Sequence, residues 1–129
     1  MNIPPGFTTV FPYIFASDPD TYLEFLEHGL GGTIQSVERA PDGALRNAQI
    51  RFGDTVVMVS DARGWDAPTH ATYYLYVENA DAAMAKAVSA GGQIRSAVKD
   101  QPYGDRQGGI TDPSGNVWWI SQHLKAGGY

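Results

Sequence analysis

The sequence predicts an α+β fold in which two βαβββ repeats form a curved, groove-bearing mixed sheet with the helices outside. Two pairs of segments support this prediction, because both recur at an offset of 61 positions: residues 13–16 match 74–77, and residues 57–60 match 118–121. Chance similarity among apolar strands does not readily give one offset for separate elements. A repeat this short cannot bury its apolar face alone, so the two copies must share one structure.

The length and composition of the chain fit one domain. A chain of 129 residues is long enough for a substantial core, and its apolar fraction of 43% is ordinary for a globular protein. We expect a single domain over residues 1–129, with repeat one at about residues 7–60, a linker at 61–69 and repeat two at about 70–123.

Charge and residue usage exclude several classes of function. The net charge of −5 and the lack of a basic run argue against a nucleic-acid partner. No apolar run approaches the ~18 residues that a membrane span needs, and no signal-peptide pattern is present. The chain has no cysteine, which excludes disulfides and Cys-ligated zinc. We therefore expect a cytoplasmic protein with neither a nucleic-acid nor a membrane partner.

The first repeat begins with a strand at residues 7–16, which are rich in aromatic and β-branched side chains. Ser17 or Asp18 caps the following helix, and Pro19 suits its first position. This helix is expected to run to about His28 and to stop at Gly29. Three strands then follow, at residues 33–39, 47–52 and 55–60, separated by turns at 41–43 and 53–54.

The second repeat follows the same order. A strand at residues 70–77 precedes Asn79, which caps a helix over about residues 80–90. Gly91 and Gly92 end that helix. A strand at residues 93–98 and a loop at 100–104 come next, and the last hairpin turns at residues 112–115.

Strand parity predicts which side chains face the groove, because successive residues alternate faces. One parity is aromatic-rich and the other is aliphatic or smaller. We assign the aromatic parity to the groove and the other to the layer under the helices, although the reverse assignment stays open at this point. The groove parity comprises Phe11, Tyr13, Phe15, Met58 and Ser60 in the first repeat and Thr72, Tyr74, Tyr76, Trp119 and Ser121 in the second.

The chain resembles the vicinal oxygen chelate superfamily, which includes glyoxalase I, extradiol dioxygenases, fosfomycin-modifying enzymes and bleomycin-resistance binding proteins. The resemblance covers about residues 7–123. Besides the paired repeats, it rests on Asp18 at the first helix, on Val-Glu-Asn-Ala at residues 77–80 and on Asp-Pro-Ser-Gly-Asn at residues 112–116. With Tyr-Gly-Asp-Arg at residues 103–106, the last segment is especially similar to bacterial glyoxalase-like proteins found in phosphonate operons.

The resemblance implies a divalent metal at four places in this sequence, namely Phe11, Met58, Thr72 and Trp119. None of these side chains is a suitable ligand, because a divalent ion needs an imidazole or carboxylate there. Neighbouring residues do not replace them. We therefore expect no metal cofactor. The alternative is a displaced divalent metal site that uses His70 and His123.

Two side chains near the last hairpin can be interpreted either as ligand-binding or as structural residues. Arg106 enters a strand expected to line the groove, where a guanidinium can grip a carboxylate or phosphate with two hydrogen bonds. An ion pair with Asp105, Asp112 or another nearby acid that holds the hairpin explains Arg106 at least equally well. Tyr103 either lines the rim of the pocket or packs against the protein.

These observations predict a metal-independent protein that binds a small planar or weakly anionic molecule, as the bleomycin-resistance relatives do. The alternative is a lyase, isomerase or dioxygenase with a displaced metal site or acid–base chemistry in the same groove. A third possibility is a scaffold whose groove is filled by its own rings. The resemblance also implies a homodimer. The predicted ligand-binding groove consists of Phe11, Tyr13, Met58, Thr72, Tyr74, Tyr76, Tyr103, Arg106 and Trp119.

Overall fold

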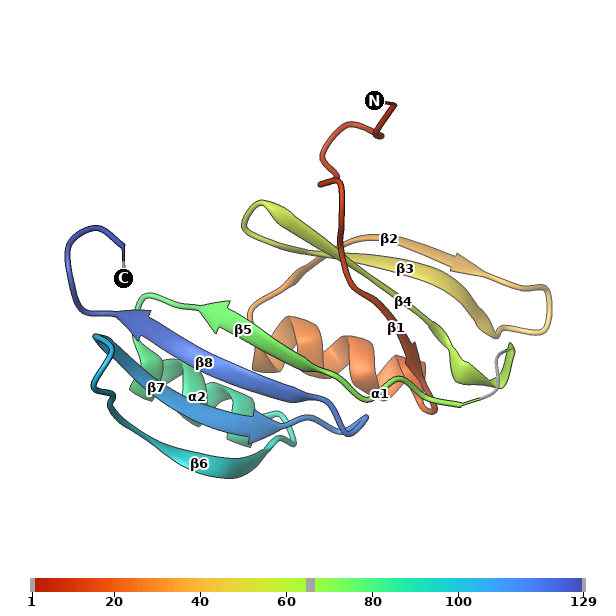
Figure 1. Cartoon of the computed structure of the whole chain (residues 1–129). Helices are drawn as coiled ribbons and strands as arrows, with labels where there is room; N and C mark the ends of the chain where they lie inside the picture. Colours follow the sequence, from red (N-terminus) through yellow and green to blue (C-terminus); the bar gives the residue numbers. More distant parts are fainter. Residues whose placement is uncertain (1, 65–66, 129) are drawn as a thin grey trace.

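The computed structural model describes residues 2–64 and 67–128, which form two four-stranded sheets with a helix on each (Figure 1). The first sheet has the order β1-β4-β3-β2 and the second has the order β5-β8-β7-β6. The strands are β1 (Tyr13–Ala16), β2 (Thr33–Arg39), β3 (Leu45–Phe52), β4 (Thr55–Asp61), β5 (Thr72–Tyr76), β6 (Gln93–Asp100), β7 (Asp105–Thr111) and β8 (Val117–His123). In both sheets the first strand is parallel to the fourth and the other pairs are antiparallel. The predicted α+β class with two βαβββ modules is confirmed.

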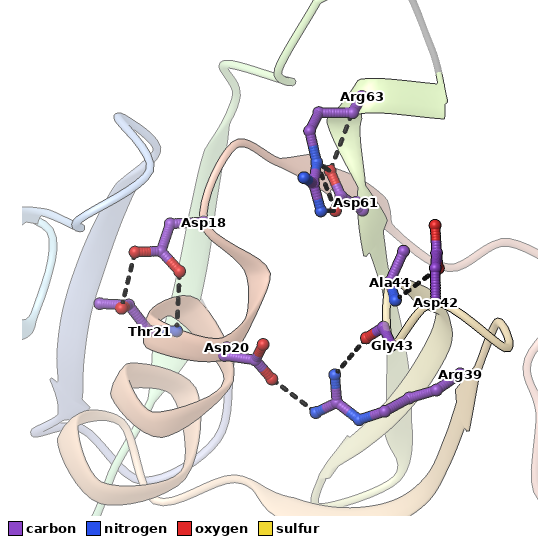
Figure 2. Close-up of polar contacts among 9 residues, drawn as sticks. All are labelled: Asp18, Asp20, Thr21, Arg39, Asp42, Gly43, Ala44, Asp61 and Arg63. Carbon is purple, nitrogen blue, oxygen red and sulfur yellow. Dashed lines mark hydrogen bonds and ion pairs between the residues drawn. The ribbon is translucent and has the colours of Figure 1, made fainter.

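The helices begin at the predicted caps. The carboxylate of Asp18 accepts hydrogen bonds from the Thr21 backbone N–H at 3.4 Å and from the Thr21 hydroxyl at 2.9 Å (Figure 2), and α1 (Pro19–Glu24) follows. The last turn, Phe25–Gly29, is π-helical rather than α-helical. In the second repeat, Asn79 caps α2 (Ala80–Ser89) by accepting from the Ala82 N–H at 3.0 Å. No helix within residues 2–64 and 67–128 is long and apolar enough to cross a membrane.

Two strands are shorter than the sequence predicts. β1 begins at Tyr13 rather than at residue 7, because Pro12 lacks an N–H and the preceding chain turns back, with the Phe7 and Phe11 rings 5.1 Å apart. β5 begins at Thr72 because Thr69 bonds to β1 instead: its N–H donates to the Phe15 carbonyl at 2.9 Å and its hydroxyl accepts from the Phe15 N–H at 3.0 Å.

The predicted linker is partly regular structure. β4 extends to Asp61, and a single 3₁₀ turn covers Ala62–Gly64. Residues 65–66 of the predicted linker lie outside the described part of the chain. Arg63 forms an ion pair with Asp61 across this turn, and Arg39 connects the Asp20 carboxylate of α1, at 2.5 Å, to the turn between β2 and β3 (Figure 2).

One core is shared by the two repeats. The aliphatic strand parity lies under the helices, where Ile14, Val59 and Ile120 are fully buried. The two helices also meet: a Cβ added at Gly29 would lie 3.0 Å from the Cβ of Ala90, at the end of α2. Rings pack together at this seam, with Trp118 of the second repeat centred 5.8 Å from Phe52 of the first and 4.6 Å from Tyr73 of its own repeat. Neither repeat encloses its apolar face alone, as its length requires.

A buried carboxylate joins the repeats. Asp112, predicted only as part of a turn, accepts hydrogen bonds from the Tyr22 hydroxyl and the Trp118 indole N–H, both at 2.8 Å. The backbone N–H groups of Ser114 and Asn116 donate to its second oxygen, each at 2.9 Å. Burial, with the nearby Asp112 carboxylate, raises the pKa of the Tyr22 hydroxyl well above its usual range. The hairpin between β7 and β8 is therefore fastened to α1.

Candidate functional site

The strand residues of the aromatic-rich parity lie on the sheet faces that point away from the helices, and their rings are open to solvent. The exposed fractions of Tyr13, Tyr74 and Tyr76 are 40%, 49% and 52%. Neighbouring rings on one strand contact each other, with centroids 4.8 Å apart for Tyr13 and Phe15 and 5.4 Å apart for Tyr74 and Tyr76. Each repeat therefore presents its own aromatic face.

On the face of the first sheet, the polar groups bond to one another. The Tyr13 hydroxyl lies 2.8 Å from the Ser60 hydroxyl, which donates to the Arg46 carbonyl at 2.6 Å. The Asn47 amide donates to the Met58 sulfur at 3.6 Å. Phe11 packs beside Phe7 just before the sheet begins. The predicted residues Phe11, Tyr13 and Met58 thus lie on or beside the first sheet.

The face of the second sheet contains an open cleft of about 530 Å³, which we call the β5–β8 cleft. It brings together three of the predicted site residues, Tyr74, Tyr103 and Trp119. Thr72 and Tyr76 share the strand face but do not line this cleft. Its lining side chains come from β5, β6, β7, β8 and the loop before β7: Tyr74, Ser96, Lys99, Gln101, Tyr103, Gln107 and Trp119.

Trp119 is positioned by a glycine on the neighbouring strand. Gly109 of β7 pairs with Trp119 of β8, and a Cβ added to Gly109 would lie 2.7 Å from the nearest atom of the indole. Three atoms of the six-membered ring lie within 3.1 Å of that point. The indole thus occupies the space that any side chain at position 109 would need, which places its ring over β7 and beside the cleft.

The other rings of the cleft are held by hydrogen bonds. The Tyr74 hydroxyl donates to Asp105 at 2.8 Å, and Asp105 is fully buried. The Tyr103 hydroxyl bonds to the side-chain oxygen of Gln107, whose amide donates to the Ser121 hydroxyl at 2.7 Å. The cleft is therefore a set of aromatic rings that the protein's own polar groups keep in place.

His123 lies between two acceptor groups. Its Nδ1 lies 2.7 Å from the Asp105 carboxylate and its Nε2 lies 2.7 Å from the Gly127 carbonyl. A carboxylate and a carbonyl both accept hydrogen bonds, so this environment favours the protonated imidazole, in which both ring nitrogens donate. Asp105 first, and then the Gly127 carbonyl, raise the pKa of His123 above its usual value.

The two histidines of the alternative metal site do not meet within the chain. His70 lies beside Gly115, before β8 begins, whereas His123 is the last residue of β8. The metal positions implied by the resemblance also lack ligands. Phe11 lies just before the first sheet and Met58 within it, Thr72 and Trp119 lie in the second sheet, and the four side chains do not fit a divalent ion. Within residues 2–64 and 67–128, no group of three or more His, Asp or Glu side chains is arranged to hold a metal.

Arg106 lies outside the cleft. Its guanidinium makes two hydrogen bonds to Asp81 in the first turn of α2, at 2.7 and 3.1 Å, and one to Asp100 at 2.9 Å. The geometry therefore agrees with a structural ion pair. The partners are other nearby acids than the two named from the sequence, because Asp105 and Asp112 bond elsewhere.

Sequence reasoning missed Lys99, Gln107 and Asp105. The alternation of side chains along β7 was the available signal. Asp105 and Gln107 lie on the same face of β7 as Gly109, which is the face that the Trp119 ring covers, and Arg106 lies on the opposite face. Lys99 pairs with Gln107 across a register shift in β6, which an alternation pattern does not reveal.

A second cavity of about 480 Å³ follows the seam between the repeats. It lies between β5 and the turn that joins β3 to β4, and its lining is mainly apolar. Tyr74 and Tyr76 border it together with the core rings of Phe52, Tyr73 and Trp118. Because the packed core forms one of its sides, this cavity is less suited than the β5–β8 cleft to present rings and polar groups together.

Two βαβββ modules in one chain, each with its first and fourth strands parallel, define the glyoxalase type of fold. The chain belongs to the Glyoxalase/Bleomycin resistance protein/Dioxygenase superfamily, whose sequence model matches residues 7–120.

Its relatives include an uncharacterised protein of Mycobacterium tuberculosis, Rv0887c, at 26% identity over 97% of this chain and 78% of the relative. CFP32 of the same species, by its name a candidate glyoxylase, is 32% identical over 88% of this chain, which spans 43% of CFP32.

Among solved structures, TioX from Micromonospora sp. ML1 superposes with a TM-score of 0.78 at 24% identity, covering 91% of this chain and 99% of TioX. TnmS3, an antibiotic binding protein from Streptomyces sp. CB03234, gives 0.70 at 22% identity, covering 90% and 98%. At these identities the likeness shows the fold alone.

Proposed function

We propose that the protein binds a small, planar molecule in the β5–β8 cleft and that binding needs no metal. The observation that carries this proposal is the cleft itself, in which Tyr74, Tyr103 and Trp119 surround an open volume of about 530 Å³. Aromatic side chains that border open space on a rigid sheet supply stacking surface for a planar ligand.

The hydrogen bonds that hold these rings favour binding. A ligand that orders mobile side chains loses about 0.5–1.5 kcal/mol for each one. Tyr74 and Tyr103 are already anchored by Asp105 and Gln107. Each aromatic pair with the ligand then contributes about 0.5–1.5 kcal/mol beyond the area that it buries.

The comparisons support a binding role by analogy. TnmS3 is described as an antibiotic binding protein, and it shares this fold. The superfamily supports many chemistries on one scaffold, so the argument for this chain rests on its cleft. Metal independence rests on the four unsuitable side chains at positions 11, 58, 72 and 119. The likeness to proteins of phosphonate operons and the cytoplasmic location stay predictions.

We also propose that the protein is a homodimer. Two aromatic faces with tyrosines 40–52% exposed are a large area to leave in water. A second copy can cover both at once if the first-sheet face of one protomer lies against the second-sheet face of the other. Such a pairing would complete the wall of the cleft.

The test compares three variants in calorimetric titrations against a panel of aromatic acids, quinones and polycyclic aromatic drugs. Trp119→Leu and Tyr103→Leu, which remove rings from the cleft, should each weaken binding about tenfold. Tyr76→Leu is the matched control, because Tyr76 shares a strand face with Tyr74 but borders only the seam cavity. Binding that survives both cleft variants and is lost in the control would reject the proposal.

Acid–base catalysis is the second candidate, and one observation favours it. Tyr74 lines the cleft while its hydroxyl bonds to a buried carboxylate that also holds His123. This row of hydrogen-bonded side chains, from Tyr74 through Asp105 to His123, could exchange a proton with a ligand, as a lyase or isomerase requires. Tyr74→Phe keeps the ring, so it should abolish turnover of any substrate while leaving binding within a factor of about three.

A further inference from the structure

Most polar side chains of the β5–β8 cleft are already occupied. Tyr74 and Tyr103 bond to Asp105 and Gln107, and the Gln101 amide donates to the Gln107 carbonyl at 3.3 Å. Among the described residues that line the cleft, the side chains of Lys99 and Ser96 on β6 make no hydrogen bond within the protein, and neither does the indole N–H of Trp119 on β8. A ligand that enters the cleft can therefore form new polar contacts with these two residues of β6.

Lys99 gives that side of the cleft a positive charge. It is exposed, and it pairs with Gln107 across the sheet. Asp100, the next residue along β6, binds Arg106, and the buried Asp105 on the neighbouring strand bonds to His123. Lys99 is also the one cation among the described residues that line the cleft.

The strand order fixes the distance between the stacking rings and this charge. In the order β5-β8-β7-β6, Tyr74 lies on the first strand, Trp119 on the second and Lys99 on the last. Lys99 pairs with Gln107, two residues along β7 from the Gly109 that pairs with Trp119. Two strand spacings of about 4.8 Å and a two-residue rise of about 6.8 Å place Trp119 and Lys99 roughly 12 Å apart at the backbone. A two-ring aromatic molecule stacked beside Trp119 spans part of that gap, and the long side chain of Lys99 can reach across the rest.

We propose that the ligand carries an anionic group, such as a carboxylate, on the edge of its planar ring system, and that Lys99 is the residue that selects for it. This inference rests on the function proposed above and adds the chemical class of the ligand. It transfers to Lys99 the role that the sequence suggested for Arg106. The aromatic rings supply most of the affinity, and Lys99 supplies the discrimination between an acid and its neutral analogue.

The test uses two probes of equal shape, 2-naphthoate and 2-naphthamide, in calorimetric titrations with the full-length protein. The wild type should bind the acid about two- to fivefold more tightly than the amide, which is the size of an exposed ion pair. Lys99→Met should remove that preference and leave affinity for the amide unchanged. Lys86→Met on α2 removes the same charge away from the cleft and should keep the preference. Added salt should reduce the preference of the wild type for the acid.

The outcomes separate this inference from the function on which it rests. If the wild type binds both probes equally, or if Lys99→Met retains the preference for the acid, the inference is wrong and the binding function stands. If neither probe binds, the proposed function fails for two-ring aromatics and the inference fails with it. Lys99 is exposed, so Lys99→Met should melt at the wild-type temperature, which rules out unfolding as the cause of a change.

Discussion

At the scale of single residues, the cleft depends on a glycine and a histidine that do not touch the proposed ligand. Gly109 leaves the space that the Trp119 indole fills. His123 holds the buried Asp105, which in turn fixes the Tyr74 hydroxyl. Substitutions at either position should therefore change the site through its geometry, without removing a lining side chain.

Gly109→Ala should displace the Trp119 ring, because the new Cβ would lie 2.7 Å from it. We expect a loss of about 1–3 kcal/mol in the free energy of unfolding, measured by urea titration, and weaker ligand binding. Gly64→Ala is the matched control, since no atom of the described residues beyond its chain neighbours lies within 4 Å of its added Cβ, and it should change neither quantity. A Gly109→Ala protein with unchanged stability and affinity would contradict the position assigned to Trp119.

His123 should make stability depend on pH. Its pKa is raised in the folded protein by Asp105 and the Gly127 carbonyl, while nearby Lys125 lowers it slightly. A raised folded pKa means that the stabilisation is complete below the unfolded value of about 6.5 and is lost as pH rises through the folded value. The wild type should therefore melt above His123→Gln at pH 5–6, and the difference should shrink at higher pH. A gap that grows with pH would refute the imidazolium assignment.

At the scale of elements, the pattern of alternation and caps predicted the repeats, both helix starts and the aromatic strand faces. The predicted starts of two strands were wrong where other features set them. Thr69 bonds to Phe15, so β5 begins later than predicted, and Pro12 lacks an N–H, so β1 also begins later. Of the two interpretations of Arg106, the structure favours the ion pair. Arg106 lies on the face of β7 opposite to Gln107, and its partners Asp81 and Asp100 hold it outside the cleft.

The hydrogen bonds of Asp112, which join α1 to the hairpin between β7 and β8, predict losses of stability of different size for two variants. Asp112→Asn puts an amide among four donors, so it should lower the free energy of unfolding by about 2–4 kcal/mol. Tyr22→Phe removes only one of these donors and should cost about 1–2 kcal/mol. Urea unfolding at neutral pH measures both. Equal and small effects for the two variants would show that the carboxylate does not fasten the repeats together.

At the scale of the whole molecule, the sequence revealed two repeats but not how their faces are used. The single chain packs its helices into a shared core and leaves both aromatic faces open. Figure 1 shows the two sheets as separate layers that diverge from the point where β1 and β5 approach each other. In the proposed homodimer a second copy covers these faces, and a pattern within one sequence does not encode such a pairing.

The homodimer proposal predicts a mass near 28 kDa, twice the 14.0 kDa of one chain, in light scattering at tens of micromolar. Tyr13→Glu puts a charge on the first-sheet face and should shift the protein toward monomer. Val88→Glu on α2 is the control, because it charges an exposed apolar position on the helix side. A monomeric wild type, or dissociation caused only by the control, would exclude pairing through the aromatic faces.

The central claim is that a planar ligand lies beside Trp119 in the β5–β8 cleft. The most direct measurement follows the indole N–H signals of the three tryptophans by ¹H–¹⁵N NMR, assigned with single Trp→Phe variants, during titration with 2-naphthoate. Trp119 lines the cleft, whereas Trp118 borders the seam cavity and donates its N–H to Asp112. We predict that the Trp119 signal shifts and saturates while the Trp118 signal stays in place. A shift of Trp118 with Trp119 unchanged, or no shift of either, would contradict the account.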